Sequence, residues 1–310
     1  IVFNGEIFNY PELRKDLISR GHKFYTQTDT EVLIHLYEEK GKNLFDDLNG
    51  QFAFAIWDKK REILLLGRDR MGIRPLFYHY LNGRLVFGSE IKALFADKQI
   101  MRRLDPHSLS DIFTCWSTLD ADTPFDGIYQ IPAGHYAQFS RNGLEVHAYW
   151  QLPINGNANY SDLPDDSISN WTEEFNALIL DAARIRLRAD VPVGAYLSGG
   201  IDSTFTSALV KKNFNNFLCT FSVRFTDDRF DETHYQESAI KALKTEHRSI
   251  RCSEDNINEI FPKVIWHTET PLVRTAPAPL YLLSRLVRDS GYKVVLTGEG
   301  ADEVLGGYDI

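Results

Sequence analysis

Two short runs combine glycines, hydroxyls and carboxylates in an order suited to binding a nucleotide phosphate. The first reads A-Y-L-S-G-G-I-D-S-T over residues 195–204, between an apolar run and a helix-compatible run, which predicts a strand, a tight turn and a helix start. Gly199 and Gly200 let the backbone approach a ligand closely, and the first helical N–H groups attract an anion. The Asp202 carboxylate would repel a phosphate unless a divalent cation lies between them, so the run predicts phosphate with Mg²⁺. A plain turn in which Ser203 caps the helix is the alternative.

The second run, T-G-E-G-A-D-E-V-L-G-G-Y over residues 297–308, follows the last predicted strand. It repeats the same chemistry, with glycines before the carboxylates of Glu299, Asp302 and Glu303. Strand ends in one parallel sheet can converge, so Asp302 can share a cation with Asp202, although an ordinary acidic loop is also possible. The first run contains neither GxxxxGK[ST] nor GxGxxG, which excludes a Walker loop and a dinucleotide fingerprint there.

The motifs resemble two known families. S-G-G-I-D-S at 198–203 is similar to the pyrophosphate loop of the ATP pyrophosphatases, which adenylate their substrates. The runs at 3–10, 28–31 and 68–76 look like the glutaminase domain of class II glutamine amidotransferases, which are N-terminal-nucleophile hydrolases with an αββα sandwich. In this order, nearly the whole chain resembles the glutamine-hydrolysing asparagine synthetase family.

For the first half, the resemblance implies a glutamine site. Asn4 and Gly5 would donate to the developing oxyanion, while Glu6 and Asp29 would bind the α-amino group of glutamine. By themselves, Asn4-Gly5 could be a turn and Asp29 a helix cap. The nucleophile of the family is an N-terminal cysteine, whereas this sequence begins with Ile1. We therefore expect a fragment, cut at both ends, that does not hydrolyse glutamine as given.

For the second half, the resemblance implies an ATP site and an aspartate-activating reaction. Asp202 and Asp302 would hold Mg²⁺ on the pyrophosphate, Glu299 would act catalytically beside the adenylated carboxylate, and Arg274 would lie near the phosphate or the acyl-adenylate. Arg274 could equally be a surface residue. The ATP-binding residues would be Tyr196, Leu197, Ser198, Gly199, Gly200, Asp202, Ser203, Val223, Thr297 and Gly298.

The implied reaction is ATP-dependent amidation of aspartate through a β-aspartyl-AMP intermediate, with ammonia supplied by glutamine. Two alternatives stay open. One is a related amidotransferase that acts on another carboxylate, such as a sugar acid or a β-lactam precursor. The other is a non-catalytic nucleotide-binding relative.

The elements that must position these residues fall into two domains. A length of 310 residues favours two domains. We expect an incomplete αββα domain at 1–150, a linker rich in Pro, Gly, Asn and Asp at 151–170, and a doubly wound parallel-sheet domain at 171–310. Helices are predicted from Pro11 to Gly21, from 28 to 41, at 89–94, 172–188, 205–210, 231–243, 256–265 and 280–288. Strands are predicted at 1–3, 51–57, 62–66, 76–80, 84–87, 134–139, 146–150, 191–197, 217–223, 247–252 and 293–297.

Composition limits the partners. The net charge of −9 does not favour nucleic acid or an anionic membrane, and no apolar run approaches the length of a membrane span. The odd number of cysteines without a CxxC pair suits reduced thiols, and hence the cytoplasm. We expect Cys115, Cys219 and Cys252 each to be buried or partly buried. The expected partners are small molecules, namely glutamine, aspartate or a similar carboxylate, and ATP, with a homodimer possible.

Overall fold

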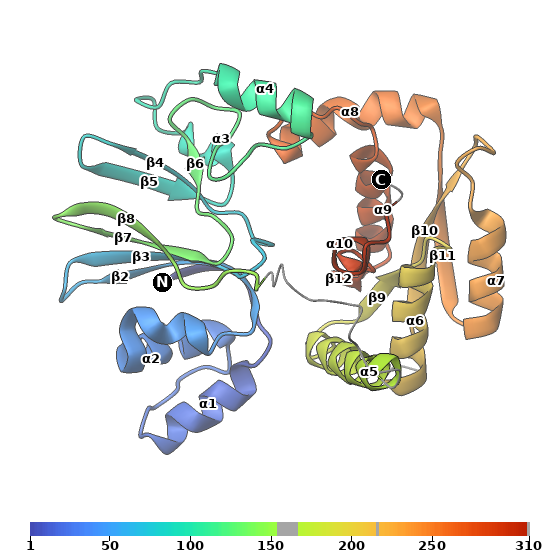
Figure 1. Cartoon of the computed structure of the whole chain (residues 1–310), viewed down its shortest axis with the longest axis horizontal. Coiled ribbons are helices and arrows are strands. Elements are labelled where there is room, and N and C mark those ends of the chain that lie inside the picture. The colour runs from blue at the N-terminus through green and yellow to red at the C-terminus, as the bar shows by residue number, and fades with distance from the viewer. Residues whose placement is uncertain (154–166, 215–216, 309–310) are drawn as a thin grey trace. The chain divides into compact units, whose positions relative to one another are not determined.

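The computed structural model describes residues 1–153, 167–214 and 217–308, and the chain folds into two compact units (Figure 1). Unit 1 comprises Ile1–Tyr160 and Thr268–Val273, and unit 2 comprises Ser161–His267 and Arg274–Ile310. Unit 1 therefore takes in a short segment whose neighbours on both sides belong to unit 2. None of the described helices combines the length and apolar character that a membrane crossing requires.

Unit 1 contains two antiparallel sheets. The five-stranded sheet has the order β1-β2-β3-β7-β8 and the three-stranded sheet has the order β5-β4-β6. The strands are β1 (Val2–Ile7), β2 (Gly50–Asp58), β3 (Ile63–Arg68), β4 (Phe77–Leu81), β5 (Arg84–Gly88), β6 (Tyr129–Gln130), β7 (His135–Ser140) and β8 (Gly143–Ala148).

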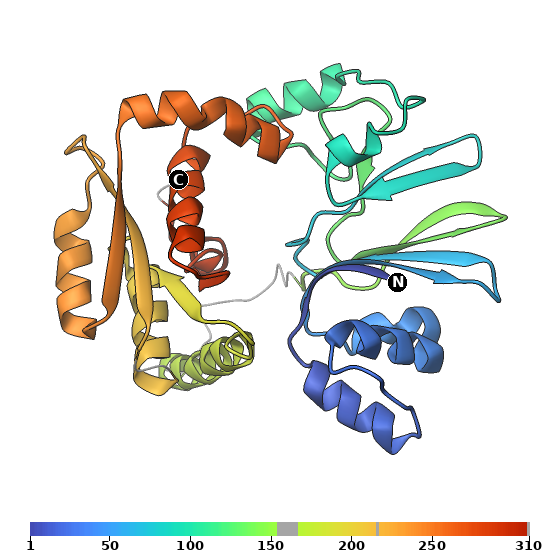
Figure 2. The ribbon, with the colours of Figure 1, turned by 180° about the vertical axis from the view of Figure 1, so that it is seen from behind.

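Alternation along β2 divides the core of unit 1 into two layers. Phe52 and Phe54 point to one face, where they stack with Phe45 and pack with residues of the helices α1 (Tyr10–Ser19) and α2 (Asp29–Lys40) and the short 3₁₀ helix η1 (Gly41–Asp46). Ala53 and Ala55 point to the other face, where small side chains let the three-stranded sheet pack closely. The helix α3 (Ile91–Leu94) packs on the outer face of that second sheet (Figure 2).

Local signals correctly predict several boundaries in unit 1. The Thr28 hydroxyl accepts from the Glu31 N–H at 3.4 Å and begins α2, and Gly41 ends it with φ 56°. Asn82 and Gly83, both at positive φ, form the predicted tight hairpin between β4 and β5.

The sequence prediction missed the helix α4 (Pro106–Cys115). The Asp105 carboxylate accepts from the Ser108 N–H at 2.8 Å and caps this helix. The helix exposes Cys115 at its end, so the expectation that all three cysteines are at least partly buried was wrong for this one, whereas Cys219 and Cys252 are buried.

Unit 2 is built on a parallel sheet, as the alternation of strands and helices predicts. The strand order is β11-β10-β9-β12, so β9 and β12 are neighbours although about one hundred residues separate them. The strands are β9 (Val193–Tyr196), β10 (Cys219–Phe225), β11 (Glu246–Cys252) and β12 (Val294–Leu296). The helices are α5 (Ser167–Arg186), α6 (Ile201–Asn213), α7 (Thr233–Leu243), α8 (Glu254–Thr268), α9 (Pro277–Asp289) and α10 (Ala301–Leu305).

Helices cover both faces of this sheet. Leu283 and Val287 of α9 pack on Phe221 at one face. Ala195 packs at the other face with Ala183 of α5 and Val210 of α6. Both faces of the sheet are therefore covered by apolar side chains, and the buried hydroxyls of Thr220 and Ser222 on β10 are the exceptions.

The helix α5 begins at Ser167, five residues before the predicted start. The residues 167–170, which we expected in the linker, are therefore helical. The rest of the predicted linker has no regular structure at 151–153, and its residues 154–166 lie outside the described ranges.

A largely buried carboxylate, that of Glu269, caps the N-terminus of α3. Glu269 belongs to the segment of unit 1 that comes from late in the sequence, and its side chain is 9% exposed. Its two oxygens accept from the Ile91 N–H at 2.6 Å and the Lys92 N–H at 2.7 Å, and the Lys92 Nζ lies at 3.2 Å. The carboxylate therefore satisfies two N–H groups of α3 and complements its dipole.

Replacing this residue, in Glu269→Gln, is expected to lower the free energy of unfolding by about 1–3 kcal/mol, because a charged acceptor of two N–H groups is lost in a buried position. Glu90→Gln is the matched control, since Glu90 is 52% exposed and pairs with the same Lys92 Nζ at 3.0 Å. It should change stability by less than about 0.5 kcal/mol. Urea unfolding of both variants measures the difference, and equal losses would contradict the capping role.

Candidate functional site

The Asn4-Gly5-Glu6 run lies on β1, directly opposite Ala53, Phe52 and Gln51 of β2. Gly5 has φ 150°, and a Cβ at this position would lie 2.1 Å from the Gln51 carbonyl oxygen. The two strands therefore approach more closely than any side chain at this position allows. The run is an ordered strand and not the turn that its composition permits.

Asp29, the first residue of α2, lies beside the C-terminal end of β1. Its Oδ2 accepts from the Ile7 N–H at 3.1 Å, which places the carboxylate next to the residue that follows Glu6. The structure thus brings Asn4, Gly5, Glu6 and Asp29 together from two segments. The alternative in which Asp29 caps a helix was wrong, because Thr28 is the cap of α2.

A buried aspartate, to which the sequence analysis gave no role, supports this arrangement. Asp69 is 1% exposed. Its Oδ2 accepts from the N–H groups of Phe52 and Arg74, and its Oδ1 accepts from those of Met71 and Ile73, all at 3.0–3.1 Å. Because Phe52 is the partner of Gly5, Asp69 fixes the strand against which the candidate glutamine residues rest. The only sequence signal was its place in the 68–76 run.

The first phosphate-loop candidate connects β9 to α6. Gly199 has φ 95°, a conformation that favours glycine, and it turns the chain toward the helix. The Ser203 Oγ accepts from the Ser198 N–H at 3.1 Å and lies 2.9 Å from the Ser198 Oγ. The Ser203 hydroxyl therefore connects the end of the loop to its beginning at Ser198. It does not cap α6, whose cap is Gly200. The Leu197 N–H is used in the sheet, where it donates to the Phe221 carbonyl at 2.9 Å.

The second candidate loop follows β12, the strand beside β9, and it touches the first. A Cβ on Gly298 would lie 2.9 Å from the Ser203 backbone nitrogen and 3.0 Å from the Asp202 Cβ. Only a glycine allows this approach. The two glycine-rich runs are therefore in contact at the carboxyl edge of one sheet, which is where open parallel sheets bind ligands.

The two aspartates occupy equivalent places in these loops. Asp202 is the second residue of α6 and Asp302 is the second residue of α10. A Cβ on Gly307 would lie 2.1 Å from the Asp302 Oδ1, so a glycine at 307 leaves the room that this carboxylate occupies. Both side chains are partly exposed. This donor set fits Mg²⁺, which takes one or two carboxylates together with phosphate oxygens and waters.

A second residue absent from the sequence analysis connects the first loop to the sheet. Gln236 of α7 is 2% exposed, and its Nε2 donates to the carbonyls of Val223 at 3.0 Å and Ser198 at 3.3 Å. The Ser222 hydroxyl donates to its Oε1 at 3.0 Å and also lies 3.0 Å from the His247 Nε2. Val223, an expected ATP-binding residue, is thus linked to the phosphate loop through the side-chain amide of Gln236.

His247 gives unit 2 a pH dependence. Burial beside Thr220 and Ser222, with a smaller effect from the Arg224 charge, lowers the pKa of His247 to about 4. An unfolded histidine takes up a proton near pH 6.5 whereas the folded one does not, so stability should fall as the pH drops from about 6.5 to about 4.

The loss attributable to His247 should reach about 3 kcal/mol at pH 4. Unfolding of the wild type and of His247→Gln should be compared at pH 7 and pH 4, since the variant lacks this titration and should lose less stability. His107→Gln is the control, because His107 is an exposed residue of α4. An equal pH dependence in the wild type and His247→Gln would contradict this origin.

Comparison with known proteins assigns a family to both units. The glutamine amidotransferase domain family matches residues 1–150, and the asparagine synthase family matches residues 174–310. The chain is 35% identical over 323 residues to the glutamine-hydrolyzing asparagine synthetase 3 of Bacillus subtilis (strain 168), covering 99% of this chain and 51% of that protein. The chain belongs to the asparagine synthetase family.

Two further relatives are similar to the chain over nearly its whole length. The glutamine-hydrolyzing asparagine synthetase 1 of Bacillus subtilis is 35% identical over 312 residues, covering 100% of this chain and 48% of that protein. The amidase chry2 of Gibberella zeae is 34% identical over 327 residues, covering 99% of this chain and 47% of that protein. The chain spans about half the length of the curated relatives it matches.

The remaining predicted residues of this asparagine synthetase family member lie in unit 2. Thr297 and Glu299 are exposed in the loop after β12. Arg274 is exposed and lies before α9, and its role beside the phosphate stays a prediction. Tyr196 ends β9, and its side chain packs with the cluster around Phe221. The ATP-binding role of Tyr196 stays a prediction.

Proposed function

We propose that the chain carries the glutamine-binding and ATP-binding parts of a glutamine-hydrolysing asparagine synthetase. The proposal assigns the glutaminase domain, an αββα sandwich of the N-terminal-nucleophile hydrolase type, to residues 1–150. It assigns the linker to 151–170 and the doubly wound ATP-pyrophosphatase domain to 171–310. The observation that carries the proposal is the contact between the two glycine-rich loops at Gly298 and Asp202.

In the synthetase half, the phosphate chain of ATP would lie over the start of α6. The Gly199 N–H and the helix dipole of α6 would bind the phosphate oxygens, and the Gly200 N–H, which donates to the Ser198 Oγ at 3.2 Å, would turn to the phosphate when ATP binds. Asp202 and Asp302 would hold Mg²⁺. When bound, this ion supplies positive charge that stabilises the departing pyrophosphate. Thr297 and Gly298 would contact ATP from the second loop, and Arg274 would add a fixed positive charge near the phosphate.

Activation is needed because a carboxylate does not react with ammonia. Attack of the aspartate side-chain carboxylate on the α-phosphorus of ATP forms β-aspartyl-AMP and releases pyrophosphate. Ammonia then attacks the acyl carbon, and AMP leaves with the bonding electrons of the acyl–oxygen bond. Glu299 would accept the proton that the attacking ammonia must lose.

In the glutaminase half, Asn4 and Gly5 would donate to the oxyanion that forms on the glutamine amide, each hydrogen bond contributing a few kcal/mol to the rate. Glu6 and Asp29 would bind the α-ammonium group by charge-assisted hydrogen bonds. Asp69 would act through Phe52 by holding β2 in register. The odd number of cysteines without a CxxC pair supports a reducing compartment, so we place the reaction in the cytoplasm.

ATP–pyrophosphate exchange tests the synthetase half directly, because exchange requires only the adenylation step. We expect exchange with aspartate and Mg²⁺, and none with glutamate, a sugar acid or no acid. Exchange that depends on another carboxylate would replace aspartate as the substrate. ATP binding without exchange for any acid would favour a non-catalytic relative, and no ATP binding would overturn the proposal.

A further inference from the structure

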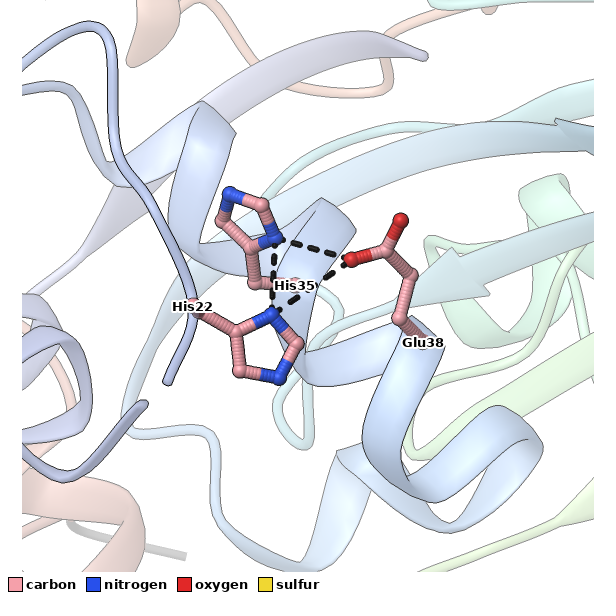
Figure 3. A group of neighbouring side chains, drawn as sticks. All are labelled: His22, His35 and Glu38. Carbon is pink, nitrogen blue, oxygen red and sulfur yellow. Dashed lines mark hydrogen bonds and ion pairs between the residues drawn. The ribbon is translucent and has the colours of Figure 1, made fainter. Parts of the chain in front are cut away.

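Two histidines and a glutamate meet in unit 1, at a place that the proposed reaction does not use. His22 lies in the loop after α1, and His35 and Glu38 lie one turn apart on α2 (Figure 3). The His22 Nδ1 is 3.1 Å from the His35 Nδ1. The Glu38 Oε2 is 2.8 Å from the His35 Nδ1 and 3.6 Å from the His22 Nδ1. One nitrogen or oxygen from each residue therefore points to a common centre.

These separations match the spacing of ligands around a small metal ion. A tetrahedral zinc ion with bonds of about 2.0–2.1 Å keeps its ligand atoms about 3.3–3.4 Å apart, by the geometry of a tetrahedron. The three distances lie on both sides of this value. Among the described residues, this set alone brings three His, Cys, Asp or Glu ligand atoms this close together.

The outer nitrogens of both rings face carboxylates. The His22 Nε2 lies 2.8 Å from the Glu39 Oε1, and the His35 Nε2 lies 3.8 Å from the Glu31 Oε1. An imidazole that keeps its proton on the Nε2 side presents a lone pair on Nδ1. Carboxylates in this position orient most metal-binding histidines and fix their tautomer.

Hydrogen bonds alone do not give each of the three ligand atoms a partner of its own. A neutral ring nitrogen carries either a proton or a lone pair, so the His35 Nδ1 cannot both donate to Glu38 and accept from His22. If it donates, one proton is shared between two acceptors. A divalent cation gives all three ligand atoms a partner at once.

We propose that His22, His35 and Glu38 form a binding site for a Zn²⁺-like divalent ion. Two imidazole nitrogens and one carboxylate oxygen suit zinc and its borderline neighbours better than Mg²⁺ or Ca²⁺, which take oxygen ligands. The histidine side chains are 15% exposed and that of Glu38 is 57% exposed, so water can reach the fourth position.

The surrounding charges favour a cation. Glu31 places one carboxylate beside His35, where its oxygens accept from the N–H groups of Tyr25 and Thr26. Glu39 adds a second carboxylate, and Arg20, whose Nη1 lies 3.8 Å from it, is the nearest cation paired with it. A divalent ion bound by the Glu38 carboxylate and two neutral imidazoles would form a centre with a net charge of +1. The carboxylates of Glu31 and Glu39 would lie beside this centre.

The site would act as a clamp on the start of the glutaminase core. Glu31 already holds the loop after α1 through the N–H groups of Tyr25 at 2.8 Å and Thr26 at 2.6 Å. The ion would add a bond between the same loop and α2. Because α2 begins at Asp29, whose carboxylate accepts from the Ile7 N–H, the clamp would stabilise the segment that carries a candidate glutamine ligand.

Zinc binding to the chelator-treated chain tests the proposal, with Mg²⁺ in excess throughout to occupy all-oxygen sites. Competition with a chromophoric chelator should give one tightly bound Zn²⁺ per chain. His22→Gln, His35→Gln and Glu38→Gln should each weaken binding at least about tenfold, the size of loss known when parts of such sites are removed. Co²⁺ in place of Zn²⁺ should give the visible absorption of a tetrahedral ion.

His147→Gln is the matched control, because the His147 Nε2 pairs with the carboxylate of Glu145 at 3.2 Å, and no third ligand joins this pair among the residues that the structure describes. It should bind Zn²⁺ as the wild type does. Zn²⁺ should also raise the Tm of the wild type and not that of His35→Gln, a readout independent of activity. Zinc binding that is absent from the wild type, or unchanged in all three ligand variants, would overturn the site. Circular dichroism shows whether a variant is folded, and the exposed Glu38→Gln keeps the test decisive if a histidine variant is not.

Discussion

Asp202→Asn is expected to reduce ATP–pyrophosphate exchange by about a hundredfold or more. Asp202 lies at the start of α6, where the Gly298 loop approaches its Cβ, and exchange requires a cation to stabilise the departing pyrophosphate. Metal stabilisation of such charge contributes several kcal/mol, and about 1.4 kcal/mol corresponds to a factor of ten in rate. The Asn side chain keeps the shape and removes the charge, so the fold should be unchanged.

The control for this variant is Asp228→Asn. Asp228 is an exposed acidic residue of the same unit, in a turn that carries no proposed ligand. Its replacement changes net charge by the same amount and should leave exchange within about twofold, as for most surface substitutions. Exchange measured against Mg²⁺ concentration gives a second readout, since Asp202→Asn should need more Mg²⁺. Equal exchange in the two variants would remove Asp202 from the site.

Gly5→Ala is expected to cost about 4 kcal/mol or more of unfolding free energy, or to prevent β1 from pairing with β2. The added Cβ would lie 2.1 Å from the Gln51 carbonyl oxygen and 2.7 Å from the Phe52 Cα. Both are backbone atoms of a central strand, so no rotation of a side chain relieves the contact. The φ of 150° adds strain for any residue with a Cβ.

Gly88→Ala in the same unit is the control. A Cβ there would first meet the flexible end of Leu94 at 3.2 Å, and Gly88 is not among the glycines at positive φ. Its cost should stay near 1 kcal/mol, since only a side chain must move. Urea unfolding, with hydrogen exchange of the β1 and β2 amides, separates the two variants. Wild-type stability and wild-type protection of those amides in Gly5→Ala would show that the paired strands accommodate the added Cβ, and would contradict the prediction.

Local chemistry in the sequence determined much of the fold. The start of α2 at Thr28 and its end at Gly41 follow from capping and from the conformational freedom of glycine. The hairpin at Asn82-Gly83 follows from the need for positive φ at both positions. The same rules could have found α4, since Asp105-Pro106 is a cap followed by proline at the first helical position. Each of these signals spans only a few residues, so it can be recognised without knowing the rest of the chain.

The sequence also predicted the residues of the motifs, but not the residues that hold those motifs in place. Asn4, Asp29 and Asp202 carry side chains whose type and spacing indicate chemistry. The sequence gives no such indication for Asp69 and Gln236, because their partners are backbone groups that only strand pairing brings near. Nothing in the sequence around either residue shows which amides or carbonyls it would meet.

The sequence by itself determined which residues could bind phosphate, a cation or glutamine, because those choices depend on side-chain type and on short spacing. Only the tertiary structure decided that β12 lies beside β9, that Gly5 touches β2, and that His22 meets α2. The reason is physical. Contacts between distant segments depend on which strands pair and which faces pack, and these are settled by burial over the whole unit rather than by any one residue.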